Sequence, residues 1–276
     1  MIIRRDICLG GLAHLPRGSA GHGLALSEQL ALLRANGYAG VVTGEHWQDI
    51  RDAGLIPCGM GRVLTPQDAL PLARLHHDAG VDFTTLHVGT GFESDDEMAR
   101  LAGAVLEAAA ITGHRLHVET HRATMTQDMR RTVDLLARFP QLSLTLDFSH
   151  WYTGHEMTYG GEFADRLAWL DPVFARVDSI QLRMGTSGSI QRPLDPASAH
   201  YRDHVAALDR CLAVRRDSPD PPDVLPVAPE LLPAMLGDGE AARPIHYADT
   251  PEQSDRFAEA LALSALAEAR LEGLQP

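Results

Sequence analysis

The chain has 276 residues, 45% of them hydrophobic, which suits one large domain such as an eight-stranded α/β barrel of roughly 250 residues. Its 24 basic and 37 acidic residues give a formal net charge of −13, which disfavours a nucleic-acid backbone or an anionic membrane surface as a partner. All of the basic residues are arginine. The absence of lysine excludes Schiff-base aldolases, pyridoxal enzymes and any lysine general base.

The cysteines, Cys8, Cys58 and Cys211, are far apart and form no paired metal or redox motif. We expect them to be reduced thiols with structural roles. The start, MIIRRDICLGG, lacks an apolar segment long enough for a signal peptide, and no apolar stretch of 18 residues follows. The expected location is therefore the cytoplasm.

Short apolar runs of strand character alternate with longer amphipathic segments, a pattern typical of α/β proteins with a parallel sheet. Seven strands are expected, and an eighth, short or irregular, is expected within 187–192. The seven runs are residues 7–10, 40–43, 82–88, 116–119, 142–147, 179–182 and 224–227. This alternation predicts a single (β/α)8 TIM barrel over residues 1–276.

Capping residues mark the starts of several helices. Thr65 precedes Pro66, residues 94–97 (SDDE) form a capping box, and residues 250–253 (TPEQ) combine both devices. The loop 237–250 follows the last strand, so it is expected to cover the barrel cavity. The expected helices are 27–36, 66–79, 95–112, 126–138, 162–176, 200–216 and 251–272.

Oxygen-bearing side chains close four of the predicted strands: Glu119 (LHVE), Asp147 (LSLTLD), Gln181 (SIQ) and Glu230 (VLPVAPE). In such barrels the carboxyl ends of the strands surround a common cavity that carries the chemistry. A carboxylate there must be solvated, paired or bound to a metal, because an isolated buried charge is costly. We therefore expect the four to meet around one metal ion or substrate; the structural alternative is a helix cap or a hydrogen bond to the next loop.

Three further side chains near these strand ends are expected to contact a substrate or the metal. His87 closes the run FTTLH before two glycines that allow close approach of a ligand, and His150 lies three residues beyond Asp147. Arg183 shares a strand face with Gln181 because side chains alternate with period two. Its planar fork suits a carboxylate or a phosphate.

Two candidates are less specific. Arg122 is suited to an anionic substrate group or, equally, to a salt bridge with Asp128 or Glu156, and Trp47 is suited to the wall of a sugar pocket or to ordinary loop packing. The sequence lacks a GxSxG elbow, a P-loop, GxGxxG after a strand and HExxH. The remaining polar residues favour metal-assisted acid–base chemistry.

The segments FTTLHVGTGFESDDE, LHVETHRATMTQD, LTLDFSHW, SIQLRMG with QRPLDP, and PVAPELLP, within residues 82–233, resemble the xylose-isomerase-like barrel proteins. That group is described broadly as sugar phosphate isomerases/epimerases and is related to endonuclease IV. The resemblance implies one divalent metal held by Glu, Asp, His and Glu, which correspond here to Glu119, Asp147, Gln181 and Glu230. His150 and Arg183 match substrate-contacting positions.

Gln181 departs from that pattern, in which histidine is usual. With oxygen at all four positions, the ion is expected to be manganese or magnesium rather than zinc. The resemblance implies a metal-dependent isomerase or epimerase of a sugar or related hydroxy-carbonyl compound, in which Glu119 and Glu230 act as base and acid on an enediolate.

Two alternatives remain open at this point. A non-catalytic metabolite-binding barrel is favoured by Gln181, and a metal-dependent phosphoester hydrolase is suggested by the related endonucleases. The expected partner is a small-molecule substrate, with no nucleic acid and no membrane. The alanine-rich end of the chain is also suited to packing on the barrel or against another subunit of a homo-oligomer.

Overall fold

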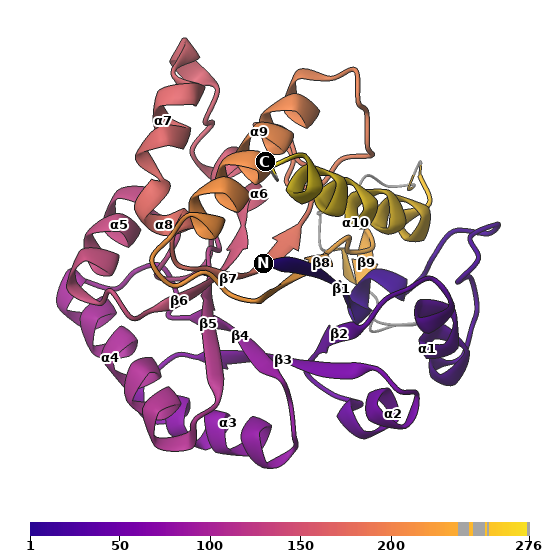
Figure 1. Ribbon diagram of the computed structural model, residues 1–276, viewed down its shortest axis with the longest axis horizontal. Helices are drawn as coiled ribbons and strands as arrows, with labels where there is room; N and C mark the ends of the chain where they lie inside the picture. The colour runs from indigo at the N-terminus through magenta and orange to yellow at the C-terminus, as the bar shows by residue number, and fades with distance from the viewer. Residues whose placement is uncertain (237–242, 245–251, 253, 275–276) are drawn as a thin grey trace.

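Eight parallel strands close into a barrel in the computed structural model, which describes residues 1–236, 243–244, 252 and 254–274 (Figure 1). Each strand pairs with its neighbour in chain order, and β8 returns to β1 with Leu225 opposite Ile3. The predicted (β/α)8 barrel is confirmed. The strands are β1 (Ile2–Cys8), β2 (Gly40–Thr43), β3 (Ile56–Val63), β4 (Phe83–Val88), β5 (Arg115–Glu119), β6 (Ser143–Asp147), β7 (Val177–Leu182) and β8 (Val224–Pro229).

The helices surround this barrel (Figure 1). A short antiparallel pair, β9 (Met235–Leu236) with β10 (Arg243–Pro244), is separate from the barrel sheet. No helix among the described residues has both the length and the apolar character needed to cross a membrane. The helices are α1 (Leu26–Ala35), α2 (Trp47–Asp52), α3 (Pro66–Asp78), α4 (Asp95–Thr112), α5 (Met129–Arg138), α6 (Phe148–Gly154), α7 (Phe163–Trp169), α8 (Asp171–Phe174), α9 (Ala199–Arg216) and α10 (Arg256–Gly273), with 3-10 turns at Leu9–Leu12 and Tyr159–Gly161.

The eighth strand is β3, and the expectation of a strand within 187–192 is wrong. The sequence of β3, IPCGMGRV, contains a proline and two glycines, which are typical of loops. These glycines are needed because α3 packs closely on the strand. A Cβ at Gly59 would lie 2.6 Å from His76 Nδ1, and one at Gly61 would lie 2.5 Å from Leu72 Cδ1.

Two predicted helices have different bounds in the structure. The segment 162–176 forms two helices, α7 and α8, because the chain turns at Leu170 before Asp171-Pro172, and proline is tolerated only in the first turn of a helix. The last helix begins after Asp255, whose side chain accepts hydrogen bonds from the backbone of Phe257 and Ala258. The cap expected within 250–253 and the loop 237–250 lie largely outside the described residues.

Two other helix starts are as predicted. Ser94 and Glu97 form the capping box of α4, and Pro66 occupies the first turn of α3 after Thr65. In the second case Asp68 accepts the backbone N–H of Thr65 at 2.7 Å. Local capping therefore places both helices as the sequence indicates.

Two clusters of buried side chains fill the barrel interior. The polar layer is a chain of hydrogen bonds from Thr85 to Thr145 (2.6 Å), Ser179 (2.7 Å) and His117 (3.0 Å). A separate apolar cluster is formed by Cys8, Val42, Cys58, Phe83 and Ala228. The polar layer is buried, and it forms the floor on which the candidate site stands.

Candidate active site

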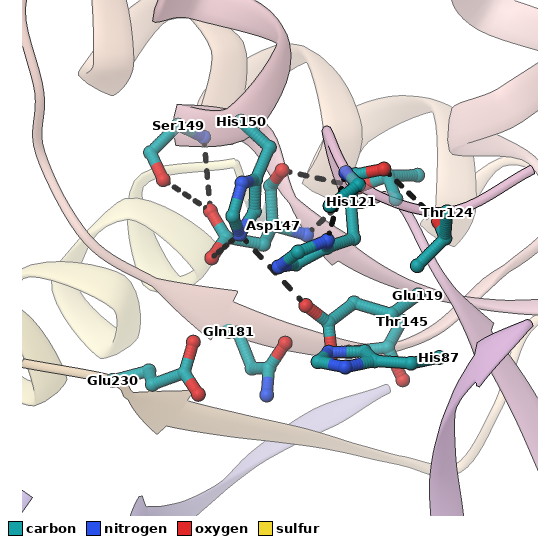
Figure 2. Close-up of polar contacts among 12 residues, drawn as sticks. His87, Glu119, His121, Thr124, Thr145, Asp147, Ser149, His150, Gln181 and Glu230 are labelled. Carbon is teal, nitrogen blue, oxygen red and sulfur yellow. Dashed lines mark hydrogen bonds and ion pairs between the residues drawn. The ribbon is translucent and has the colours of Figure 1, made fainter. Parts of the chain in front are cut away.

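Glu119, Asp147, Gln181 and Glu230 lie at the carboxyl ends of four successive strands, β5 to β8, at the same mouth of the barrel (Figure 2). The first three stand two residues after members of the polar layer and so point to the same interior face. Glu230 follows β8, and its backbone N–H donates to the Leu182 carbonyl at 3.2 Å. All four side chains are buried.

Arg183 reaches into this group from the residue after β7. Its side chain is fully buried and forms ion pairs with Asp147 and, at 3.2 Å, with Glu230. The same nitrogen, Nη2, lies 3.2 Å from His150 Nε2, and the guanidinium Nε donates to Ser149 Oγ at 3.1 Å. One guanidinium nitrogen therefore contacts two carboxylates and an imidazole.

Gln181 presents its amide to Glu119. In the orientation that satisfies both groups, the amide nitrogen lies 2.9 Å and 3.2 Å from the two carboxylate oxygens. Figure 2 shows Gln181 between Glu119 and Glu230. The amide thus acts as a donor to a neighbouring carboxylate.

Three histidines gather around Glu119. His87 Nε2 is 3.1 Å from one carboxylate oxygen, and His150 Nε2 is 4.0 Å from the other. The His121 ring lies between them, with centroids 4.4 Å from His87 and 3.9 Å from His150. Glu119 is therefore enclosed by donors and rings on one side and by Gln181 on the other.

The charges of this cluster shift the pKa values of the histidines in opposite directions. Burial lowers the pKa of His87, but the Glu119 carboxylate outweighs it, and the pKa lies above 6.5. Burial, and then the charges of His87, Arg183 and Arg122, lower the pKa of His121 to about 3. Burial and Arg183 also lower the pKa of His150 well below its usual value. His121 and His150 are therefore neutral at physiological pH.

Burial raises the pKa of Glu230 above its usual value of 4.5, and the charges of Glu119 and Asp147 act in the same direction, while Arg183 opposes them. This carboxyl group therefore holds a proton at a higher pH than an exposed glutamate does. A protonated carboxyl group at the mouth of a barrel is a possible proton donor.

Two groups of residues have potential metal-ligating atoms within 4.8 Å of one another: Glu119, Asp147 and His150, and His87, Glu119 and His121. The first differs from the expected set, because it contains His150 in place of Gln181 and Glu230. Arg183 Nη2 contacts both Asp147 and His150, so a cation already lies against two of its three members. This group does not fit a divalent ion.

The second group does not fit one either, because of the tautomer of His121. The backbone N–H of Ala123 donates to His121 Nδ1 at 3.1 Å, so the ring proton is on Nε2. A histidine that binds a metal through Nε2 needs the opposite arrangement, with Nδ1 as a donor. The expected oxygen site of Glu119, Asp147, Gln181 and Glu230 stays a prediction. In this structure the Gln181 nitrogen faces Glu119, and Arg183 pairs with Asp147 and Glu230.

Trp47 does not form the expected pocket wall. Its indole N–H donates to the Thr43 carbonyl at 3.1 Å, and its ring packs edge-on against His76, with centroids 4.7 Å apart. His76 is buried and lies 2.6 Å from Thr84 Oγ1, on the helix-facing side of β4. Trp47 therefore packs in the helical layer.

Arg122 is exposed in the loop after β5, and its charge reaches both His121 and His150, whose pKa values it lowers. Its role as an anion-binding residue stays a prediction. Sequence reasoning did not select His121 or Ser149, although both lie beside selected residues. The signal available for each was its place two residues after a strand-end carboxylate, in ETH and DFS.

Comparison with solved structures shows that the chain has the xylose-isomerase-like barrel fold. A xylose isomerase domain protein from Planctomyces limnophilus gives a TM-score of 0.60 at 15% identity, over 99% of this chain and 98% of that one. A xylose isomerase-like TIM barrel protein from Mycobacterium smegmatis, in complex with magnesium, gives 0.58 at 12% identity, over 98% and 97%.

A third structure, a sugar phosphate isomerase/epimerase from Parabacteroides distasonis, gives a TM-score of 0.57 at 11% identity, over 97% of this chain and 95% of that one. Neither the family models nor the curated protein sequences compared with the chain give a match. At these identities the likeness is one of fold.

Proposed function

We propose that the chain is an isomerase or epimerase of a sugar or a related small hydroxy-carbonyl compound, acting by proton transfer through an enediolate. The observation that carries the proposal is the presence of two buried carboxyl groups, Glu119 and Glu230, at one barrel mouth in different surroundings. Glu119 is held by the donors His87 and Gln181, while Glu230 lies beside Arg183. Two carboxyl groups in unlike environments are suited to separate base and acid roles.

In this proposal Glu119 removes the proton from the carbon next to the carbonyl group. His87 and Gln181 fix the direction of the carboxylate, which is what a base needs in order to meet a carbon acid. Glu230, whose pKa is raised by burial, supplies a proton to the enediolate from the other side of Gln181. In this proposal Glu119 begins the cycle as the base and Glu230 as the acid.

Arg183 and the neutral histidines would stabilise the negative charge that develops on the substrate oxygens. A guanidinium carries five N–H donors in a fixed plane, and a buried, preorganised donor stabilises charge more effectively than water does. Ser149, Asp147 and His150 hold this guanidinium in place. No step of this mechanism passes through a metal ion, because the ligand groups do not fit one.

The two alternatives are less well supported. A phosphoester hydrolase of the expected kind would need several metal ions, and the buried acids Asp147 and Glu230 are instead paired with Arg183. A binding protein without activity would hold a ligand without exchanging its protons. Proton exchange therefore separates the leading proposal from both.

The test is incubation of the protein in heavy water with a panel of ketoses, inososes and hydroxy-keto acids, with EDTA in one series and manganese or magnesium in another. We expect deuterium at the carbon next to the carbonyl group of one class of compound, detected by NMR or mass spectrometry. Glu119→Gln should stop the exchange, and Glu107→Gln, on the exposed face of α4, is the matched control. A ligand that binds without any exchange would contradict the proposal and favour the binding protein.

A further inference from the structure

We infer that the Arg183 guanidinium takes the place of a divalent metal ion, as a cation built into the chain between Asp147 and Glu230. This inference deepens the proposed function, since it names the electrophile of the site. Its test needs no substrate, so a failed activity screen and a failed metal test would be distinguishable.

The contacts of a single nitrogen atom carry the inference. Arg183 Nη2 pairs with Asp147, lies 3.2 Å from Glu230 Oε2 and lies 3.2 Å from His150 Nε2. These are two carboxylates and an imidazole converging on one positively charged point, an arrangement that otherwise suits a metal ion. The side chain of Arg183 is fully buried, so the charge has no alternative position in solvent.

A divalent ion cannot share this position with the guanidinium. An ion bound to Asp147 and Glu230 would lie within about 4 Å of a fixed positive charge, and repulsion at that distance weakens binding by at least roughly 100-fold even at an effective dielectric constant of about 20. Arginine also remains charged at all relevant pH values. The site is therefore closed to a second cation as long as Arg183 is present.

The hydrogen bonding of Gln181 is consistent with a guanidinium in place of a metal ion. Its amide nitrogen lies 2.9 Å and 3.2 Å from the two carboxylate oxygens of Glu119, so the amide serves as a donor to Glu119. A histidine at this position would offer a nitrogen ligand to a metal, and a glutamine acting as a donor does not. Residues 181 and 183, on the same strand face, thus both favour the guanidinium arrangement.

The experiment compares metal binding in purified proteins stripped with EDTA. Manganese would be added to the wild type, Arg183→Met, the double variant Gln181→His with Arg183→Met, and the charge-keeping control Arg183→Lys. Bound manganese is counted by EPR, and the melting temperature is measured with and without the ion. We expect the double variant to bind one ion at least roughly 100-fold more tightly than the wild type, because a like charge has been removed and a nitrogen ligand added.

Manganese should also raise the melting temperature of Arg183→Met, because the ion replaces the missing partner of Asp147 and Glu230, and it should leave Arg183→Lys unchanged. A wild type that binds one manganese ion, with binding weakened tenfold or more by Glu230→Gln, would overturn the inference. So would a folded double variant that gains no affinity. If the Arg183→Met proteins do not fold, the comparison of the wild type with Glu230→Gln still decides the question.

Discussion

Arg183 and Asp147 form an ion pair across β7 and β6 in which neither side chain is exposed to solvent. The pair stands on the hydrogen-bonded polar layer of the barrel, and it is joined by Glu230, Ser149 and His150. Breaking such a pair leaves a buried charge without compensation, whereas an exposed pair contributes little to stability. The stability of the fold is therefore linked directly to the chemistry of the site.

Arg183→Met should lower the free energy of unfolding in EDTA by roughly 3–5 kcal/mol, because Asp147 would remain as an unpaired buried carboxylate. The control is Arg130→Met, which removes the partner of Asp134 in an exposed pair and should cost no more than about 1 kcal/mol. Urea unfolding followed by circular dichroism measures both. Equal losses in the two variants would mean that the buried pair is not the stabilising interaction.

The free energy of unfolding should fall as the pH decreases from about 6.5 towards 4, in part because of His204. Burial lowers the pKa of this residue to about 4. Its Nε2 accepts the Gly185 N–H at 3.3 Å while Nδ1 bonds to the His200 carbonyl at 2.9 Å, so only the neutral ring fits. A depressed folded-state pKa gives stability that is present above 6.5 and lost in acid, here by at most about 3 kcal/mol.

The measurement for His204 is the midpoint of urea unfolding at a series of pH values for the wild type, His204→Gln and His77→Gln. His204→Gln should flatten the decline between pH 6.5 and 4, because an amide does not titrate in this range. His77 is exposed on α3, and its replacement should leave the wild-type slope. Parallel curves for the wild type and His204→Gln would show that this histidine does not cause the decline.

Gly59→Ala should destabilise the protein by roughly 1–3 kcal/mol, since overpacking forces neighbours to shift. The new Cβ would lie 2.6 Å from His76 Nδ1 and 2.7 Å from Thr84 Oγ1. Gly103→Ala is the matched control, because nothing lies within 4 Å of its added Cβ, and alanine in the middle of α4 should add about 0.5–1 kcal/mol. Thermal unfolding of both variants gives the comparison, and stabilisation by both would contradict the packing account of β3.

Glu230→Gln should reduce the turnover number by roughly 10²–10⁴-fold once a substrate is known, because the amide cannot transfer a proton. In the wild type the turnover number should fall as the pH rises through the raised pKa of Glu230, since the acid is then lost. The variant should lack this alkaline decline, and Glu107→Gln should keep it. An unchanged pH profile in Glu230→Gln would assign the proton transfer to another group.

Much of the fold could be predicted from the sequence because most strands are short apolar runs and several helices carry capping residues. The exception, β3, was not identified because Gly59 and Gly61 have loop character in the sequence. Their small size is required only by α3, which packs against the strand from a separate segment of the chain. Contacts of this kind leave no local signal.

In the candidate site, too, some features could be predicted from the local sequence and others depend on contacts between distant segments. The common position of Glu119 and Glu230 at one mouth follows from their place at strand ends, which the sequence reveals. The ion pairs of Arg183 cannot be predicted in this way. The alternation of side chains along a strand gives the face on which Arg183 lies, but not the partners that its long side chain reaches. His121 was missed because its position depends on a loop in which Thr126 accepts the His121 N–H at 3.1 Å.

The covalent attachment of Arg183 has a consequence for how the protein would depend on its surroundings. A bound ion can be removed by a chelator, exchanged for a competing ion or lost when supply is short, whereas a side chain is delivered with every copy of the chain. If the guanidinium is the electrophile, the protein requires no loading step after folding. Its activity would then follow the amount of protein alone and would be the same in metal-starved and metal-replete conditions.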